Sequence, residues 1–250
     1  MATLGIDIGG SGIKGALIDL ENGQMVTPRQ RIPTPEGADP KNVSNVLKEL
    51  VDYFDYRGPI GCGFPAVIQN GIALSAANVH KDWVNTNAEK IFSEATGSPV
   101  YVINDADAAG LAEMKYGAGK DFYKGTVLMI TLGTGIGAAI FTNGHLLPNV
   151  EFGHLQVRGK DAEHRASDAV RKEQQLSWKK WSKRLQEVLS YMELLVSPDV
   201  IIIGGGVSKD HEKYFPYLQT KAKLIPAQFL NQAGIVGAAL YAKMRSRSEF

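Results

Sequence analysis

The sequence has one cysteine, Cys62, and no apolar run that approaches the roughly 18 residues of a membrane span. A lone thiol excludes an internal disulfide framework and a cysteine zinc cluster, so we expect no structural zinc. No basic and then apolar segment opens the chain, so we also expect no signal peptide, no membrane partner and a cytoplasmic location. The net charge of +1 favours no class of partner by itself.

The 250 residues, 44% of them hydrophobic, suffice for one large domain or two modest ones with a real core. Apolar strands alternate with helical patterns, which predicts an α/β fold with largely covered sheets. The predicted strands and hairpins cover residues 3–19, 25–32, 61–65, 99–103, 126–141 and 200–203. The predicted helices cover residues 40–54, 83–96, 106–116, 163–197 and 234–244.

A glycine-rich turn follows the first strand, in which Leu4, Ile6 and Ile8 share one face and Asp7 projects from the other. Glycines let backbone N–H groups approach an anion, because no Cβ stands in the way. A carboxylate beside such a turn suits a hydrated Mg²⁺ that accompanies phosphate. A plain hairpin with a solvated aspartate is the alternative.

A similar unit occurs later in the chain, where an apolar strand leads into Gly133-Thr134-Gly135. An offset of 123 residues sets Gly133 against Gly10 and also matches a glycine, an isoleucine and an alanine that follow. Two strand–turn–strand units in the two halves indicate a duplicated fold with a phosphate clamp between them, unless the likeness of two glycine-rich hairpins is chance.

Basic residues gather between positions 158 and 184, where nine stand against four acidic ones, a net +5. A solvated helix face explains most such runs. A surface track for an extended polyanion is the other reading.

Two short motifs could carry chemistry. Asn104-Asp105 lies at a strand end just before a helix, where an aspartate could accept a proton from an attacking hydroxyl, or the pair could simply cap the helix. Glu151 and His154 are three residues apart and could bind a metal, grip a polyol or sit on a loop; metal is the least expected of the three.

The ordered motifs together resemble the ROK family of bacterial sugar kinases, over residues 4 to about 242. Within it the chain most resembles the polyphosphate glucokinases and glucomannokinases, through residues 31–35, 63–65 and 76–83. The motifs that carry the family resemblance are residues 7–14, 104–107, 132–137, 151–154 and 198–206.

This resemblance implies a duplicated actin-like ATPase-domain fold, related to ribonuclease H, with two lobes and a central cleft. It places the smaller lobe at residues 1–105 with the C-terminal helix of about 234–250, and the larger lobe at 106–233. It implies transfer of a phosphoryl group from inorganic polyphosphate to the 6-hydroxyl of glucose, with Mg²⁺, in a homodimer that binds neither nucleic acid nor membrane.

Site residues follow from the resemblance position by position. Asp105 is the expected general base, and Asp7 the expected ligand of Mg²⁺ through water. The expected sugar-binding residues are Asn78, Asn104, Asp105, Glu151, His154 and Glu163. The expected donor-binding residues are Asp7, Gly9, Gly10, Ser11, Gly12, Lys14, Thr131, Gly133, Thr134, Gly135, Gly204 and Gly205. The expected polyphosphate track is Arg165, Arg171, Lys172, Lys179, Lys180, Lys183 and Arg184.

The chain departs from the family pattern after Glu151 and His154. Many ROK proteins carry a cysteine-rich zinc loop there, whereas residues 159–163 contain no cysteine, which places the sugar role of Glu163 in doubt. Three functions stay open: a polyphosphate-dependent glucokinase, a kinase that uses ATP alone or as well and accepts glucose or mannose, and a sugar-sensing regulator without catalysis.

Overall fold

The computed structural model describes residues 2–76 and 79–247, which form two compact units. The first unit comprises the described residues up to Ala112 and from Gln232 onward, and the second comprises residues 113–231. Among the described helices, none has the length and apolar character needed to cross a bilayer. The arrangement of strands and helices confirms the predicted α/β fold, with two mixed sheets.

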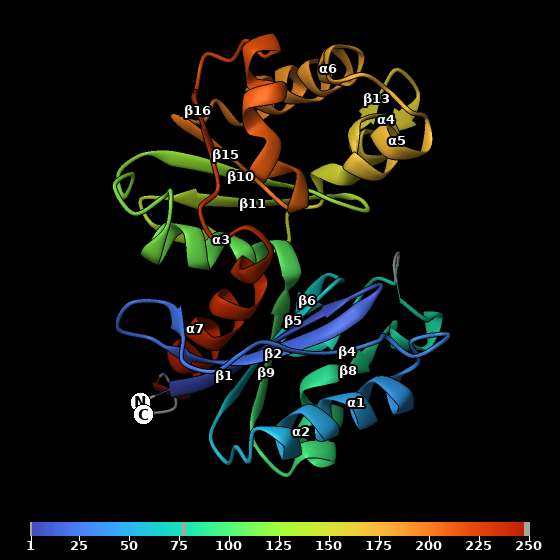
Figure 1. The fold of residues 1–250 in the computed structure, drawn as a ribbon, viewed down its shortest axis with the longest axis vertical. Helices are drawn as coiled ribbons and strands as arrows, with labels where there is room; N and C mark the ends of the chain where they lie inside the picture. Colours follow the sequence, from blue (N-terminus) through green and yellow to red (C-terminus); the bar gives the residue numbers. More distant parts are fainter. Residues whose placement is uncertain (1, 77–78, 248–250) are drawn as a thin grey trace. The chain divides into compact units, whose positions relative to one another are not determined.

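The first unit holds a six-stranded sheet, with the strand order β3-β2-β1-β5-β9 and with β4 paired to β2 (Figure 1). A second, three-stranded sheet consists of β6, β7 and β8. The strands are β1 (Ala2–Gly9), β2 (Gly12–Asp19), β3 (Gln24–Met25), β4 (Gln30–Ile32), β5 (Ile60–Phe64), β6 (Ile68–Gln69), β7 (Ile72–Ala73), β8 (Thr86–Asn87) and β9 (Val100–Asn104). The helices are α1 (Pro40–Tyr53), the 3-10 turn η1 (Lys81–Trp83), α2 (Ala88–Thr96), α3 (Asp105–Tyr116, which continues into the second unit) and α7 (Ala233–Arg247).

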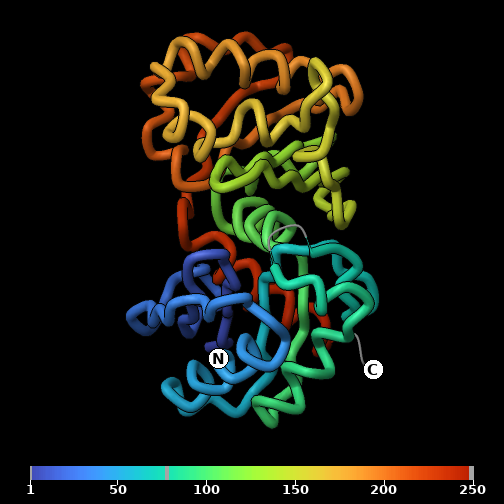
Figure 2. Tube along the Cα trace, turned by 90° about the vertical axis from the view of Figure 1, so that its right-hand side faces the viewer, coloured from blue at the N-terminus to red at the C-terminus, as the bar shows by residue number. Residues whose placement is uncertain are grey.

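Helix α7 packs directly on strands β1 and β5 of this sheet, and the trace in Figure 2 shows the red C-terminal helix beside these strands. A Cβ on Gly5 would lie 2.0 Å from the Ile235 carbonyl oxygen, and one on Gly61 would lie 1.7 Å from that of Ala238. Real Cβ atoms do not come this close to backbone, so only glycine at these two strand positions permits the contact. The last described helix of the chain therefore completes the core of the first unit.

The second unit repeats the topology around a five-stranded sheet of order β12-β11-β10-β15-β16. Its strands are β10 (Thr126–Leu132), β11 (Ile136–Thr142), β12 (His145–Leu147), β15 (Val200–Gly204) and β16 (Lys223–Pro226), with the separate hairpin β13 (Gln156–Val157) and β14 (Lys160–Asp161). Its helices are α4 (Ala162–Ala166), α5 (Asp168–Glu173), α6 (Trp178–Val196) and the 3-10 segments η2 (Phe152–His154), η3 (Gly206–Lys213), η4 (Phe215–Tyr217) and η5 (Leu230–Gln232, at the boundary).

The two hairpins correspond closely, but the offset of 123 residues holds only for their second strands. The first hairpin joins Gly9 and Gly12 through a two-residue turn, whereas the second joins Leu132 and Ile136 through three residues. The register of the first strands is therefore displaced by one residue. In consequence Thr131, paired with Gly204, occupies the position that Asp7, paired with Gly63, occupies in the first unit.

Three predicted elements are wrong in detail. The helix predicted over 163–197 is three helices, since Ser167 and Ser177 adopt extended backbone and cap α5 and α6 through their hydroxyl groups. The helix predicted over 83–96 begins only at Ala88, after the cap Asn87. The strand predicted over 25–32 is two short strands, β3 and β4.

Candidate functional site

The carboxyl ends of β1, β5 and β9 bring two acidic residues to one edge of the first sheet. Asp7 is paired across the parallel strands with Gly63, and Asp105 follows the last residue of β9. A Cβ on Gly63 would lie 3.8 Å from the Asp105 Cα and 3.8 Å from Asp7 Oδ1. Glycine at this position therefore leaves the space between the two aspartates open. Residues almost a hundred positions apart in the sequence form one acidic site.

Two positive groups lie next to the Asp7 carboxylate, namely the ammonium group of Lys14 and the start of helix α7. Lys14 Nζ lies 3.2 Å from Asp7 Oδ2, in a pair whose side chains are each about one-fifth exposed. On the other side, a Cβ on Gly234 would lie 3.0 Å from Asp7 Oδ1, so the first turn of α7 approaches the carboxylate closely. The start of a helix carries partial positive charge, which favours an anion there.

The turn between β1 and β2 is open at its tip. Gly10 and Ser11 are exposed, and a Cβ on Gly10 would meet no atom within 4 Å. The Thr34 hydroxyl donates a hydrogen bond to the Gly9 carbonyl oxygen and so ties the following segment to the turn. A pocket of about 380 Å³ adjoins this turn and is lined by Ile8, Gly9, Gly10, Thr34, Pro35, Glu36, Gly37, Ala38, Val79 and His80. Asn78, expected to bind sugar, lies outside the described residues.

Asn104 caps the helix that Asp105 begins. Its Oδ1 accepts from the backbone N–H groups of Ala106 and Asp107, at 2.9 and 3.1 Å, while its Nδ2 donates to the Ala66 carbonyl oxygen at 3.1 Å. The side chain is buried. The capping role considered from the sequence is therefore present, and Asn104 fixes the first turn of α3 and with it the backbone of Asp105. Within residues 2–76 and 79–247, the Ala66 carbonyl oxygen is the one acceptor found for the two hydrogens of Asn104 Nδ2.

The glycine turn of the second unit follows β10, and its amides are partly engaged. The Gly133 N–H donates to the Gly135 carbonyl oxygen at 3.0 Å, and the Gly133 carbonyl accepts from Ala169 N–H at 3.0 Å. A Cβ on Gly133 would meet no atom within 4 Å, so one face of the turn is open. Thr134 is exposed. An anion at this turn would approach the open face rather than the Gly133 N–H.

Gly204 and Gly205 end the neighbouring strand β15. Gly204 is paired with Thr131, so the predicted donor-binding residues of this unit gather at the carboxyl ends of β10 and β15. Gly205 has φ +81°, and a Cβ there would lie 2.3 Å from the Leu132 carbonyl oxygen. Only glycine meets both conditions, which explains the glycine run after this strand.

A second cluster contains three predicted sugar-binding residues, Glu151, His154 and Glu163. Glu163 Oε2 faces Gly135 and lies 3.4 Å from the Ile136 backbone N. Burial raises the pKa of Glu151, and Glu163 adds to this, while the charge of His154 opposes it. In the second unit the structure thus brings Glu163 close to Glu151 and His154, the two residues of the motif.

His154 is held by Asp161, a residue that sequence reasoning did not assign. His154 Nδ1 lies 3.0 Å from Asp161 Oδ2, and Gln156 Nε2 donates to the other carboxylate oxygen. This hydrogen bond raises the pKa of His154 and lowers that of Asp161. The hairpin β13–β14, closed by Arg158 and Gly159 with positive φ, pairs Gln156 with Asp161. The turn at Arg158-Gly159 was the signal in the sequence that could have predicted this hairpin, and with it the position of Asp161 near His154.

The same cluster bears on metal binding. His154, Asp161 and Glu163 each offer one ligand atom, and these atoms lie within 4.8 Å of one another. Imidazole and carboxylate are acceptable zinc ligands, so the geometry would admit a metal ion. The expectation that this protein binds no structural zinc therefore stays a prediction.

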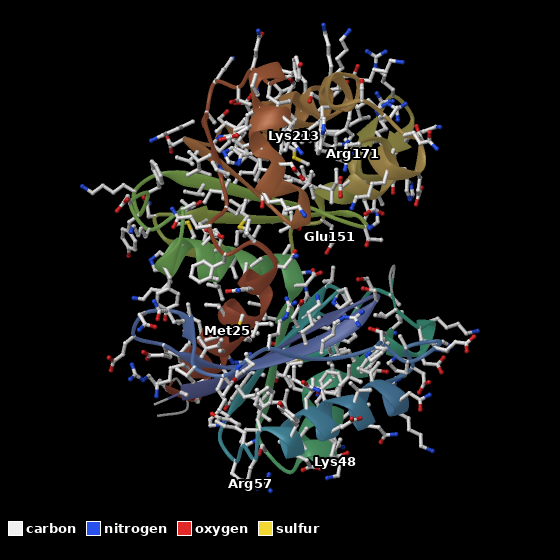
Figure 3. All side chains as sticks on the ribbon, in the orientation of Figure 1. Met25, Lys48, Arg57, Glu151, Arg171 and Lys213 are labelled. Atoms are coloured by element: carbon white, nitrogen blue, oxygen red, sulfur yellow. The ribbon has the colours of Figure 1, made fainter. Side chains whose placement is uncertain are left out.

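The predicted polyphosphate track is spread over α4, α5 and α6, and four of its seven residues have partners. Arg165 pairs with Glu187, Arg171 and Lys172 both pair with Asp168, and Arg184 donates to Gln174. Arg171 also lies 4.0 Å from the ring centre of Trp178, which Lys213 approaches at 5.6 Å. Arg171 and Lys213 are labelled in Figure 3. Within the described part of the chain, no carboxylate pairs with the exposed residues Lys179, Lys180 and Lys183.

Two α/β units, each built on a strand–glycine turn–strand hairpin whose first strand pairs in parallel with the next, define a fold of the actin-like class. The profile of the ROK family matches residues 3–166. That is well over half of the chain, and the chain belongs to the ROK family.

Known proteins resemble the chain over nearly its whole length. It is 47% identical over 237 residues to the polyphosphate glucokinase of Mycobacterium tuberculosis (strain CDC 1551 / Oshkosh), which covers 94% of this chain and 89% of that protein. The corresponding protein of Mycobacterium leprae (strain TN) is 44% identical over 94% of this chain and 73% of its own length.

Solved structures agree. The inorganic polyphosphate/ATP-glucomannokinase of Arthrobacter sp. strain KM has a TM-score of 0.94 and 47% identity, over 98% of this chain and 99% of that one. A ROK family glucokinase from Streptomyces griseus, in complex with glucose and AMPPNP, has a TM-score of 0.83 at 23% identity, over 98% and 100%. At that identity the second likeness shows the fold alone.

Proposed function

We propose that this protein transfers the terminal phosphoryl group of inorganic polyphosphate to the 6-hydroxyl of glucose, giving glucose 6-phosphate. The observation that carries the proposal is the convergence of Asp7 and Asp105 beside an open glycine turn. A base, a carboxylate for a metal ion and an anion-binding turn are the parts that phosphoryl transfer requires. The likeness to polyphosphate glucokinases at 47% identity over 94% of the chain supports the choice of substrates.

Asp105 is the general base in this proposal. It accepts the proton of the 6-hydroxyl as the oxygen forms its bond to the terminal phosphorus. The bond to the next phosphate breaks, and its electron pair leaves on the polyphosphate chain, which is one unit shorter. Asn104 supports this step by holding the first turn of α3.

Asp7 is the residue that would hold Mg²⁺, through water. The fit rests on the chemistry of the residue, an oxygen-donor carboxylate on the strand that leads into the open glycine turn three residues later. A bound Mg²⁺ would neutralise charge on the phosphates. The proposed donor-binding residues of the first unit are Gly9, Gly10, Ser11 and Gly12. Those of the second unit are Thr131, Gly133, Thr134, Gly135, Gly204 and Gly205.

The proposed sugar-binding residues are Asn78, Asn104 and Asp105 in the sequence of the first unit, and Glu151, His154 and Glu163 in that of the second. Asp161 sets the orientation of His154: if Nδ1 carries the proton that Asp161 accepts, Nε2 is left as an acceptor for a sugar hydroxyl. The basic residues of α4, α5 and α6 would hold the rest of the donor chain. Among the described residues, Lys179, Lys180 and Lys183 have no carboxylate partner, and Arg184 is bonded only to the Gln174 amide.

The experiment that tests the function is a donor assay on the purified protein. Glucose 6-phosphate formation is measured with long-chain polyphosphate and with ATP in separate reactions, for the wild type and for Asp105→Asn. We expect activity with polyphosphate, and a loss of about 10²- to 10⁴-fold in kcat in the variant, because a carboxamide cannot accept the proton. Isothermal titration should show unchanged glucose binding. Activity with ATP alone would refute the proposed donor, and an unaffected variant would favour a non-catalytic sensor.

Use of ATP as well as polyphosphate is the second candidate function. The structural likeness to a protein described as an inorganic polyphosphate/ATP-glucomannokinase favours it, and the same likeness makes mannose a candidate acceptor. The ATP arm of the donor assay and a parallel reaction with mannose test both points.

We also propose a homodimer and a cytoplasmic location. Helix α6 exposes Tyr191, Leu194 and Leu195, with Leu194 77% exposed, at a spacing that puts them on one face of the helix. Light scattering coupled to size exclusion would show the oligomer, and Leu194→Glu should then yield monomers. The cytoplasmic location agrees with the buried free thiol of Cys62.

A further inference from the structure

Three charged residues form a row across adjacent strands of the first unit. Asp7 on β1 is paired with Lys14 on β2, and Lys14 is paired with Arg31 on β4. Directly opposed residues of antiparallel strands have side chains on the same face. The ion pair of Lys14 and Asp7 agrees with that geometry. Arg31 therefore faces the same side of the sheet as the acidic site.

Arg31 lies against the glycine turn. Its Nη2 donates a hydrogen bond to the Ser11 carbonyl oxygen. A Cβ on Gly12 would lie 2.5 Å from Arg31 Nε and 2.7 Å from Cζ, so the guanidinium occupies the space that any other residue at 12 would need. At the other end of the turn, a Cβ on Gly9 would lie 3.7 Å from Lys14 Nζ. A cation thus stands at each end of the turn, and its tip is open.

The charges of the two cations are balanced differently. Lys14 is paired with Asp7, whereas no carboxylate in residues 2–76 and 79–247 pairs with Arg31. One hydrogen bond to a backbone carbonyl occupies one of the five N–H groups of a guanidinium. The others remain available, and their planar arrangement suits the oxygens of a phosphate group.

The position of Arg31 is also fixed by its surroundings. It lies in β4, and three residues later the Thr34 hydroxyl donates to the Gly9 carbonyl oxygen. The segment from Arg31 to Thr34 is thereby attached to both ends of the turn, and the pocket of about 380 Å³ adjoins it. A tethered guanidinium loses less conformational freedom on binding an anion than a free one does.

We propose that Arg31 is a donor-binding residue that contacts the phosphate groups of polyphosphate next to the one transferred. The inference rests on the proposed function for the identity of the donor. Arg31 supplies the uncompensated positive charge at the turn, where negative charge accumulates on the leaving chain. Lys14 balances Asp7 and so contributes less net charge to the same end of the hairpin.

The test compares Arg31→Gln with Arg29→Gln. Arg29 is an exposed arginine two residues away for which no ion pair is found in the described residues, so it controls for the loss of a surface charge. Initial rates are measured against polyphosphate and against glucose, and tripolyphosphate binding is measured by calorimetry without glucose. We expect Arg31→Gln to raise the KM for polyphosphate, and the Kd for tripolyphosphate, by about 10- to 100-fold, with the glucose KM within twofold of wild type.

Arg31→Lys keeps the charge but not the planar fork, so it should recover only part of this loss. It also replaces the first variant if Arg31→Gln does not fold, as judged by its melting temperature. Donor parameters in Arg31→Gln or Arg31→Lys equal to those of Arg29→Gln would overturn the inference, as would an equal loss for glucose. A wild type that binds tripolyphosphate but phosphorylates no glucose would refute the proposed function and not the role of Arg31.

Discussion

Replacing Gly61 by alanine should displace helix α7 from the sheet of the first unit. The added Cβ would lie 1.7 Å from the Ala238 carbonyl oxygen, 2.2 Å from its carbonyl carbon and 2.9 Å from Ala239 N. All three are backbone atoms, so no rotation of a side chain relieves the contact. The helix must move by more than an ångström, away from a strand it packs on along with β1.

The size of the effect follows from that geometry. Overpacking a core costs about 1–3 kcal/mol where side chains can adjust. Since here the backbone of a helix must move, we expect a loss in unfolding free energy of at least about 3 kcal/mol. For a chain of this length this corresponds to a fall in Tm of about 6–12 °C. The same shift of α7 would carry Gly234 away from Asp7, so kcat should fall as well.

The assay is thermal unfolding followed by circular dichroism, with Gly206→Ala as the matched control. A Cβ on Gly206 would meet Asn231 Oδ1 at 3.6 Å, which is an ordinary contact, so this variant should melt within about 2 °C of wild type. A Gly61→Ala protein that melts with the control would refute the close approach of α7 to β5.

Three further outcomes are expected. Asp161→Asn should lower the pKa of His154 towards its ordinary value, because the hydrogen bond that His154 donates to Asp161 is the main cause of the raised value; nuclear magnetic resonance titration of EDTA-treated protein measures this. In the wild type the stability gained from the charged imidazole is fully present below the unfolded-state pKa of about 6.5, and it is lost as the pH rises through the higher folded-state pKa. Glu113→Ala should cost about 3 kcal/mol in chemical unfolding, because this fully buried carboxylate accepts from the backbone N–H groups of residues 118, 228 and 229 at 2.7–2.9 Å. Replacing Lys179, Lys180 and Lys183 together by glutamine should raise the KM for long-chain polyphosphate more than the KM for tripolyphosphate. The increase should be larger at low salt than at high salt.

Each of these has an outcome that contradicts it. An unchanged His154 titration in Asp161→Asn would mean that the hydrogen bond does not set the imidazole's protonation. The control for Glu113→Ala is Glu94→Ala, since Glu94 is exposed. If the two variants have equal free energies of unfolding, the buried hydrogen bonds of Glu113 do not stabilise the protein. Equal effects of the lysine changes on short and long donors would place these lysines outside any extended track.

Local signals in the sequence were enough for several elements. Asp39 and Pro40 mark the start of α1, and the structure has the Asp39 carboxylate accepting from Asn42 N–H. The two glycine turns, each between apolar strands, predict the duplicated fold. Such turns can be predicted because periodicity and turn chemistry depend on neighbours in the chain. The parallel pairing of the strands beside them is known only from the structure.

Where local signals conflicted, the prediction failed. Residues 163–197 have a helical composition throughout, but the serine hydroxyls at 167 and 177 compete for backbone N–H groups and divide the segment into three helices. Trp181, Leu185, Val188 and Leu195 recur at helical spacing, which predicts a core face. The first three are buried, whereas Leu195 is 60% exposed.

The sequence by itself determined which residues have the chemistry: a carboxylate after a strand at Asp7, another at Asp105, and glycines where backbone must come close. Only the tertiary structure decided which residues lie next to them. Strand order set Asp7 beside Gly63, and register set Arg31 beside Lys14. The physical reason is that side-chain period fixes the face of a residue, whereas its partners across a sheet depend on pairings between distant segments. The bond from His154 to Asp161 likewise depends on a hairpin closed by two residues of positive φ.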